Sequence, residues 1–192
     1  MATARFDEEA CHYIVLLGDV GTGKSTLVEK VSDTTGISSD TSTSCTRVSF
    51  LYQSFDNRIL ICDTPGSNAM SDKFNHNAWI ASAINYSPVS RILICVVAHT
   101  RIANVIDVVR KYIEGFMDLP QMEDILAVCV THMDQVNWSQ EEFKTTLNGE
   151  LGIESVIFSS IETKGISNYL LKFIFSKKAT KIDEIFTVDL TS

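Results

Sequence analysis

The sequence has no apolar run near the roughly 20 residues that a membrane-crossing helix requires. Its longest such run, 92–98, has the length of a strand. Positive charge is not in excess either: the net charge is −8, whereas general nucleic-acid binding needs a basic face. Residues 1–9 are polar and acidic, unlike a secretory signal. With no internal repeat or low-complexity tract, the composition predicts a globular cytoplasmic protein that does not bind nucleic acid.

The five cysteines also lack the spacing of a known site. Their number is odd, and no two form a Cys-x-x-Cys pair. Cys62, Cys95 and Cys129 each fall within an apolar, strand-like run. This pattern is typical of reduced, buried thiols in a cytosolic protein, and it offers no zinc-ligand spacing.

Apolar runs alternate with helical patterns, which is typical of an α/β fold with a mainly parallel sheet. We expect one domain at 12–176, an N-terminal extension at 1–11 and a C-terminal tail at 177–192. The turn residues Asp56 and Asn57 predict one hairpin, hence one antiparallel edge strand in a mostly parallel six-stranded sheet with helices on both faces. The strands are expected at 13–17, 47–55, 58–62, 91–98, 125–130 and 155–158, and the helices at 25–32, 79–86, 102–116, 139–147 and 165–175.

The stretch 18–25 fits the Gly-x4-Gly-Lys-Ser/Thr pattern of a phosphate-binding loop. Its glycines allow a turn with positive φ that aims consecutive N–H groups at anionic oxygens, and the helix that follows adds its positive dipole end. Lys24 supplies a charge to the β- and γ-phosphates, and the Ser25 hydroxyl can bind Mg²⁺. An apolar run before the loop and helical spacing after it complete the strand–loop–helix context. The loop therefore predicts binding of a nucleotide.

Three further polar signatures follow predicted strands, at 63–66, 131–134 and 159–160. Ligands of open α/β sheets bind outside the carboxyl ends of the strands, so these segments and the phosphate loop are expected to meet around one ligand. Asp63 is the predicted acidic residue of the Mg²⁺ site. Gly66 allows close backbone approach, which would bring its N–H to the γ-phosphate.

In this order and spacing, the phosphate loop, a Ser/Thr-rich loop, Asp-Thr-Pro-Gly and Thr-His-Met-Asp resemble a guanine-nucleotide-binding domain over about residues 12–175. The resemblance is to translation-factor-related GTPases, and within them to the AIG1/immunity-associated group with its septin and chloroplast-import relatives. It implies a three-layer P-loop NTPase fold of the Ras-like type, GTP or GDP as ligand, Mg²⁺ as cofactor, and hydrolysis of GTP.

The resemblance also implies roles for single residues. Asp134 matches the acidic residue that accepts two hydrogen bonds from guanine, a donor pair that adenine lacks. His132 stands where the family often has Lys and would stack on the base, while Thr131 replaces the usual Asn and implies a weaker supporting contact. Ser159 and Ser160 resemble the segment whose backbone N–H meets guanine O6.

One Thr of the first switch is expected to reach Mg²⁺ and the γ-phosphate. Thr46 is favoured because Ser44-Cys45-Thr46 resembles the Ser-x-Thr of the immunity-associated group; Thr43 and Thr41 are the alternatives. The predicted catalytic residues are Lys24, Thr46 and Gly66, the metal ligands are Ser25, Thr46 and Asp63, and the nucleotide-binding residues are Gly18, Asp19, Val20, Gly21, Thr22, Gly23, Lys24, Ser25, Thr26, Asp63, Gly66, Thr131, His132, Asp134, Ser159 and Ser160.

Two departures from the family pattern bear on catalysis. Ser67 and Asn68 stand where many small GTPases carry a water-positioning Gln, and Val20 replaces a Gly, which would crowd an inserted activator side chain. Hydrolysis is therefore expected to be slow, or to be assisted by a dimer partner. The candidate donors in trans are Arg47, Arg91 and Arg101, although surface salt bridging is the favoured interpretation of these arginines. The candidate water-positioning side chains are His76 and His99.

The expected function is a molecular switch whose segments 38–47 and 66–77 order around GTP and Mg²⁺ and are released on hydrolysis. Two alternatives stay open: a scaffold that binds GTP, forms a homodimer across the nucleotide face and hardly hydrolyses it, and a P-loop phosphotransferase, which would need an Arg-rich lid. An effector or activator protein is the expected partner. Membrane attachment through the lysine cluster at 177–181 would need a second signal.

Overall fold

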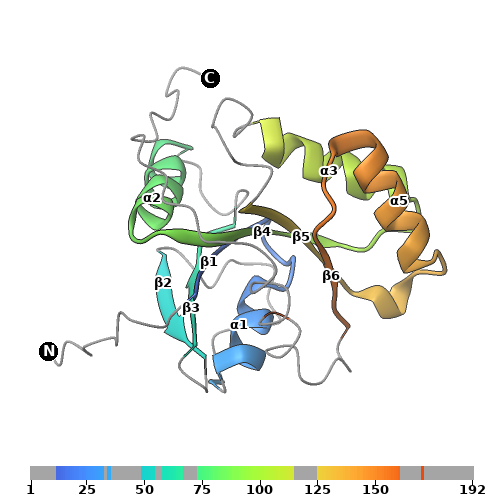
Figure 1. Cartoon of the computed structure of the whole chain (residues 1–192). Helices are drawn as coiled ribbons and strands as arrows, with labels where there is room; N and C mark the ends of the chain where they lie inside the picture. The colour runs from blue at the N-terminus through green and yellow to red at the C-terminus, as the bar shows by residue number, and fades with distance from the viewer. Residues whose placement is uncertain are drawn as a thin grey trace, which may run out of the picture.

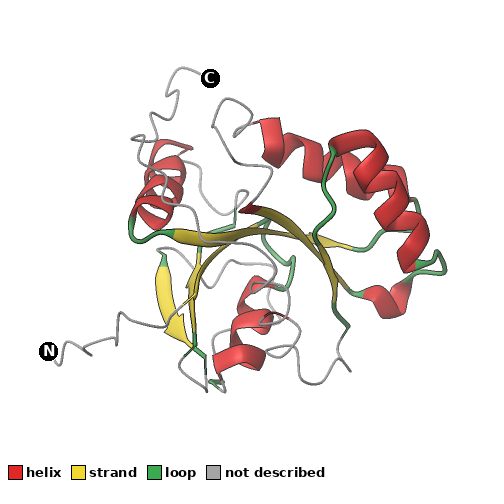
Figure 2. Ribbon diagram, viewed as in Figure 1, coloured by secondary structure: helices red, strands yellow, loops and turns green. Residues whose placement is uncertain are grey.

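Six strands form one sheet in the computed structural model of the chain, which describes residues 12–32, 34–35, 49–54, 58–66, 73–114, 125–160 and 170 (Figures 1 and 2). The strand order is β2-β3-β1-β4-β5-β6. β2 runs antiparallel to β3, and the other neighbours are parallel, which confirms the predicted sheet. The strands are β1 His12–Leu17, β2 Phe50–Gln53, β3 Ile59–Asp63, β4 Val89–Val97, β5 Leu126–Thr131 and β6 Val156–Phe158.

Helices cover both faces of the sheet, as predicted. α2, α3 and α5 lie on one face and α1 lies on the other (Figure 1). The helices are α1 Lys24–Ser32, α2 Lys73–Asn85, α3 Ile102–Glu114 and α5 Gln140–Leu151, and a short 3₁₀ helix, η1, spans Met133–Gln135. Among the described residues, no helix has both the length and the apolar character needed to cross a membrane.

The boundaries of two predicted helices need comment. α2 begins several residues before the predicted 79–86, so Asn77, at the end of the predicted switch segment 66–77, is helical. The start of α2 is rich in Asn and His, which have low helix propensity, and this hid it from the sequence pattern. Of the helix predicted at 165–175 the structure describes Leu170, which is helical and buried on the α1 side. The predicted extensions 1–11 and 177–192 lie outside the described residues.

The central strands are apolar throughout because both of their faces are covered. In β1, Tyr13, Val15 and Leu17 join the core beneath α2, α3 and α5, while Ile14 and Leu16 join the core above α1. Side chains of a strand alternate between faces, so a strand buried on both sides reads as a continuous apolar run. This arrangement places the loops that follow the parallel strands at one edge of the sheet.

The ends of α5 show the capping that fixes where it lies. Ser139 Oγ accepts a hydrogen bond of 3.1 Å from the backbone N–H of Glu142, as the capping-box pattern predicts. At the other end Gly152 adopts φ 69° and its N–H donates to the carbonyl of Asn148 at 2.9 Å. α5 therefore starts and stops at residues that the sequence specifies locally.

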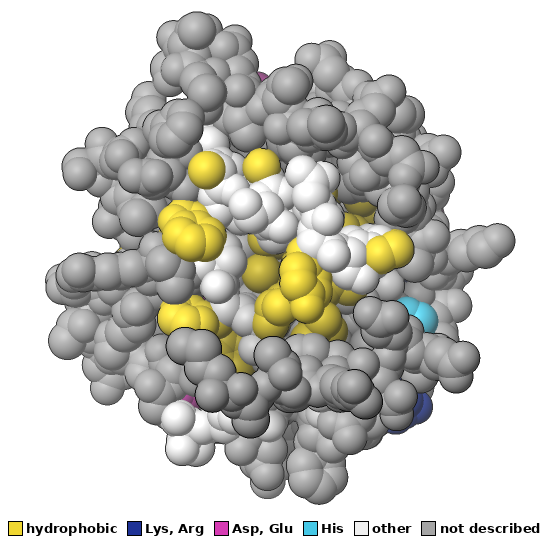
Figure 3. Space-filling model, turned by 90° about the vertical axis from the view of Figure 1, so that its left-hand side faces the viewer, with side chains coloured by type: hydrophobic (Ala, Val, Ile, Leu, Met, Phe, Trp, Pro, Cys, Tyr) yellow, Lys and Arg dark blue, Asp and Glu magenta, His cyan; other side chains and the backbone are white. Residues whose placement is uncertain are grey.

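The side of the molecule formed by β2 and α2 shows several hydrophobic side chains among the described residues (Figure 3). Phe50 on the edge strand β2 is 48% exposed, and its ring centroid lies 6.4 Å from that of Tyr52. Tyr86, just after α2, is 54% exposed. In the described part of the chain, this side therefore carries two of the three exposed large hydrophobic residues.

Candidate functional site

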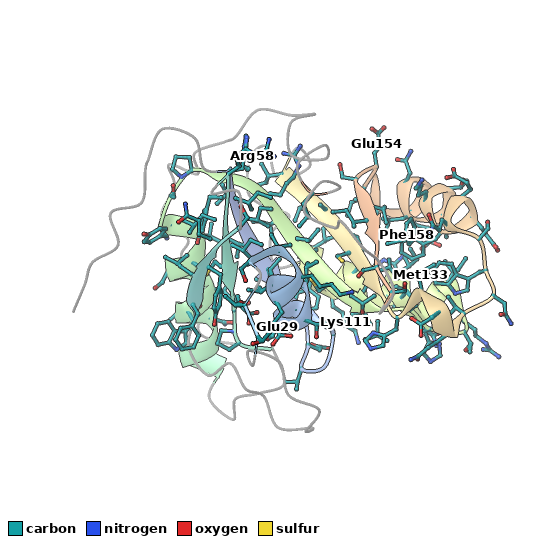
Figure 4. All side chains as sticks on the ribbon, turned by 90° about the horizontal axis from the view of Figure 1, so that it is seen from below. Glu29, Arg58, Lys111, Met133, Glu154 and Phe158 are labelled. Atoms are coloured by element: carbon teal, nitrogen blue, oxygen red, sulfur yellow. The ribbon has the colours of Figure 1, made fainter. Side chains whose placement is uncertain are left out.

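Four of the predicted signatures follow β1, β3, β5 and β6, and these strands are parallel to one another through β4. Their carboxyl ends therefore share one edge of the sheet. Figure 4 shows the two edges: Arg58 and Glu154 precede strands, at the far edge from Met133. The loops that carry the predicted chemistry thus meet at one edge, as expected from the sequence.

The phosphate loop joins β1 to α1 in a conformation that needs glycine. Gly21 and Gly23 have φ of 81° and 82°, which side chains disfavour. Gly18 has φ 150°, and a Cβ built there would lie 2.4 Å from the carbonyl oxygen of Cys95 on β4. The loop is thus pressed against the centre of the sheet, with Thr22 buried and Thr26 exposed on the first turn of α1.

Lys24 is buried at the start of α1 and folds back over the loop. Its Nζ donates to the carbonyl oxygen of Gly18 at 2.8 Å and to that of Asp19 at 2.9 Å. Burial lowers the pKa of Lys24, while the nearby acidic groups of Cys95, Asp63 and Asp19 act in the opposite direction. The ammonium group is therefore held within the loop, where phosphate oxygens are predicted to bind.

Ser25 and Asp63 meet beside the loop. Ser25 Oγ donates to Asp63 Oδ2 at 2.8 Å, across 38 residues of sequence. A hydroxyl and a carboxylate are oxygen ligands that suit Mg²⁺, which keeps several waters and takes phosphate oxygens, so few protein ligands are needed. Although the described residues contain no group of three His, Cys, Asp or Glu placed to bind a metal, this pair fits the implied ion.

The segment after β3 lies directly on the phosphate loop. Thr64 Oγ1 donates to the carbonyl of Leu16 on β1. A Cβ on Gly66 would lie 2.6 Å from the backbone nitrogen of Val20 and 2.8 Å from its Cγ2. Gly66 has no positive φ, so glycine is required for this approach to Val20 and not for the backbone conformation. Gly66 thus lies against Val20 of the phosphate loop, and the predicted contact of its N–H with the γ-phosphate stays a prediction.

Thr131 ties the end of β5 to the phosphate loop. Its Oγ1 lies 3.0 Å from the carbonyl oxygen of Thr22 and 3.2 Å from that of Val96. The same oxygen lies 3.0 Å from Nδ1 of His132. A hydroxyl has one proton to donate, so when it donates to either carbonyl the contact with His132 requires hydrogen on Nδ1. Thr131 thus makes a buried contact with the phosphate loop, and the prediction that this contact is weaker than that of the usual Asn stays a prediction.

The residues predicted to meet the base lie close to one another. His132 adopts the left-handed conformation, φ 56° and ψ 36°, and starts the turn that carries Asp134, which is exposed. Ser159 joins this turn from β6: its carbonyl accepts from the N–H of Met133 at 3.3 Å, and its N–H donates to Val130 at 2.8 Å. The segments after β5 and β6 are therefore held side by side.

Some predicted residues lie outside the described part of the chain: Thr41, Thr43, Thr46, Arg47, Ser67 and Asn68. His76 lies on α2, where the backbone alone is described. His99 is exposed after β4, and its Nδ1 lies 3.0 Å from the amide nitrogen of Asn104.

Neither interpretation of Arg91, as a donor to a partner's nucleotide or as a surface salt bridge, fits its burial. Arg91 is 1% exposed and lies near the start of β4, opposite Ile14, at the edge of the sheet away from the phosphate loop. Its Nη1 donates to the carbonyl of Ser90. The sequence pattern did not show that an arginine would be enclosed near the start of a buried strand. Arg101, in contrast, is exposed just before α3.

Three contacts at the site were not predicted. The Tyr112 hydroxyl on α3 donates to Oδ1 of Asp19 at 2.8 Å, and Lys30 Nζ on α1 donates to the carbonyl of Ser160 at 2.8 Å. Thr64, described above, is the third. Tyr112 and Lys30 lie outside every sequence motif and reach residues 93 and 130 positions away in sequence. Thr64 belongs to the motif 63–66, so its hydroxyl at the end of a predicted strand could have indicated a contact with a neighbouring strand.

Comparison with solved structures supports the fold. An Era variant from Aquifex aeolicus bound to GDP·AlF4− superposes with a TM-score of 0.66 at 15% identity, over 91% of this chain and 58% of that one. An NFeoB mutant from S. thermophilus bound to GMPPNP gives 0.63 at 16% identity, over 91% of this chain and 65% of that one. The chain thus spans less than two thirds of the length of these structures. No protein with a curated description matches the sequence.

The sequence itself matches a family model. The model is described as "50S ribosome-binding GTPase" and covers residues 13–132, more than half of the chain. The matched segment runs from β1 to the residue after β5 and includes the phosphate loop, Asp63 and Thr131. The chain therefore belongs to the family described as 50S ribosome-binding GTPases, a P-loop GTPase family, and has the predicted Ras-like G-domain fold.

Proposed function

We propose that the chain binds GTP and GDP with Mg²⁺ and hydrolyses GTP slowly, as a molecular switch in the cytoplasm. The observation that supports this most is a set of hydrogen bonds that joins three strand-end loops: Lys24 to Gly18, Ser25 to Asp63, and Thr131 to Thr22. These contacts put a cation, a hydroxyl–carboxylate pair and a helix N-terminus at one edge of the sheet. That combination suits a triphosphate chain with its metal ion.

Ser25 and Asp63 would hold Mg²⁺, with Thr46 as a further ligand from the first switch. The bound ion supplies charge neutralisation at the β- and γ-phosphates. Lys24 adds a positive charge on the same phosphates, and the N–H of Gly66 would orient the γ-phosphate. In this proposal the chain contributes mainly positioning and charge, which suffices for attack of water in line with the leaving group.

Guanine would be selected by the segments after β5 and β6. Asp134 is exposed at the turn that follows β5, so its carboxylate is accessible to the N1 and 2-amino donors of guanine. The segment Ser159–Ser160 would offer one backbone N–H to O6, that of Ser160, since the N–H of Ser159 donates to Val130; Lys30 holds the carbonyl of Ser160. Adenine lacks the donor pair that a carboxylate needs, so ATP should bind more weakly.

The contact between Val20 and Gly66 supports slow hydrolysis. A single Cβ on Gly66 would already lie 2.8 Å from Val20 Cγ2, so the space beside the γ-phosphate position is narrow. An activating side chain inserted from another protein would have to displace Val20. Two further points belong to this proposal. A second copy across the nucleotide face would assist hydrolysis, and the chain would fall within the immunity-associated group that its sequence resembles.

Equilibrium binding of a fluorescent GTP analogue in Mg²⁺ tests the proposal. Lys24→Ala should weaken binding at least tenfold, a loss of about 1.4 kcal/mol, because the cation that faces the phosphates is removed. The matched control is Lys144→Ala, since Lys144 is partly exposed on α5, pairs with Glu141 and lies outside the phosphate loop. Unchanged binding by Lys24→Ala, with the control also unchanged, would reject the assignment.

Turnover separates the switch from a scaffold. A slow intrinsic GTPase shows a rate per molecule that is low and independent of concentration. Activation across the nucleotide face makes the rate per molecule rise with protein concentration, and a scaffold without hydrolysis shows no phosphate release at any concentration. Phosphate release measured over a wide range of protein concentration distinguishes the three.

A further inference from the structure

Tyr112 connects α3 to the phosphate loop. Its hydroxyl donates a 2.8 Å hydrogen bond to Oδ1 of Asp19, the second residue of the loop. We propose that Tyr112 is a positioning residue that holds the Asp19 carboxylate against α3 and thereby slows release of the bound nucleotide. This inference rests on the guanine-nucleotide binding proposed above, and it adds to that site a residue from outside the sequence motifs.

Tyr112 is presented by a rigid element. α3 packs on the sheet through four buried residues that share one face of the helix: Val105, Ile106, Val109 and Ile113. Tyr112 neighbours this stripe and is itself half-buried, packed against the same core. Because core contacts hold both α3 and the Tyr112 side chain, the hydroxyl is presented to Asp19 from a packed part of the molecule.

Asp19 links the Tyr112 contact to Lys24, the residue proposed to bind the phosphates. Its carbonyl oxygen accepts from Lys24 Nζ at 2.9 Å and from Thr22 Oγ1 at 2.9 Å. Asp19 therefore helps to place the Lys24 ammonium group through its carbonyl oxygen and contacts Tyr112 through its side chain. Release of the side chain would loosen one of the two carbonyl anchors of Lys24.

The charge of Asp19 gives the contact a second effect. A carboxylate in a loop that receives a polyanion is unfavourable if it turns toward the phosphates, because like charges repel more strongly where water is excluded. A phenol donating to a carboxylate makes a charge-assisted hydrogen bond, which is stronger than a neutral one. Tyr112 thus draws the negative charge toward α3 and away from the ligand position.

Release of a fluorescent GDP analogue from the full chain, chased with excess GDP, tests the inference. Tyr112→Phe removes the hydroxyl and keeps the ring, and it should release the analogue about three- to tenfold faster, the size of a typical net hydrogen-bond contribution. Tyr86→Phe is the matched control: the same atom is deleted from an exposed tyrosine just before β4, at the other edge of the sheet, and release should be unchanged.

A second background tests whether charge is the reason. Asp19→Asn retains an oxygen that can accept from Tyr112 but carries no charge, so adding Tyr112→Phe to it should speed release less than about twofold. An equal acceleration in both backgrounds would show that Tyr112 does not act through the charge of Asp19 and would overturn the inference. So would release by Tyr112→Phe at the wild-type rate. A wild-type chain that retains no guanine nucleotide would instead refute the proposed function, and the inference with it.

Discussion

The hydroxyl of Thr131 offers a sharp test of how the site is assembled. Thr131→Val replaces the hydroxyl by a methyl group of similar size and leaves the buried carbonyls of Thr22 and Val96 with one donor fewer, at 3.0 and 3.2 Å. Loss of a buried hydrogen-bond partner costs about 1–3 kcal/mol. We expect the free energy of unfolding to fall by about that amount, and the Tm to fall by about 2–4 °C for each kcal/mol.

Thr131→Ser is the control because it keeps the hydroxyl and loses the methyl group. Nucleotide affinity should fall in Thr131→Val and be largely retained in Thr131→Ser, since the carbonyl of Thr22 belongs to the phosphate loop. Unfolding in denaturant and titration with a fluorescent GDP analogue measure the two effects. Equal behaviour of the two variants would refute the reasoning, because the hydroxyl would then contribute nothing that the methyl group does not.

Three further predictions follow from single contacts. Gly66→Ala should destabilise the fold by about 1–3 kcal/mol and weaken GTP more than GDP, because its Cβ would lie 2.6 Å from the Val20 backbone nitrogen; an unchanged GTP:GDP affinity ratio would contradict this. Ser139→Ala should cost about 1 kcal/mol in denaturant unfolding through the lost helix cap, whereas Ser139→Asp should not. Burial raises the pKa of Cys62 to about 11, so the folded chain retains a proton that the unfolded chain loses, and stability should fall as the pH rises from about 9 to about 11. Cys62→Ala should flatten that part of the pH profile, and an unaltered slope would show that other groups cause it.

The parts of the fold that repeat locally were predictable from the sequence. α3 carries a periodicity of about 3.6 residues because it buries one face, and β1 is a continuous apolar run because it buries both. The cap at Ser139 depends on residues three apart. The phosphate loop was found because its glycines and Lys24 act within eight residues of one another.

Contacts between distant segments were not predictable in the same way. Nothing near Tyr112 in sequence indicates that its hydroxyl will meet Asp19, and the burial of Arg91 depends on the strands and helices around it. The role of Thr131 was judged from the residue it replaces in related proteins. The structure shows that its hydroxyl reaches the carbonyl of Thr22. Sequence patterns report local periodicity, whereas these features follow from tertiary packing.

Base selection by Asp134 is the central claim of the account. Calorimetric titration of the wild-type chain and of Asp134→Asn with GTP, ATP and xanthosine triphosphate tests it directly. The account predicts that the wild-type chain binds GTP at least about tenfold more tightly than ATP, a difference of about 1.4 kcal/mol, and that Asp134→Asn exchanges this preference for xanthosine triphosphate. Equal affinity of the wild-type chain for ATP and GTP, or an Asp134→Asn variant that still prefers GTP, would contradict it.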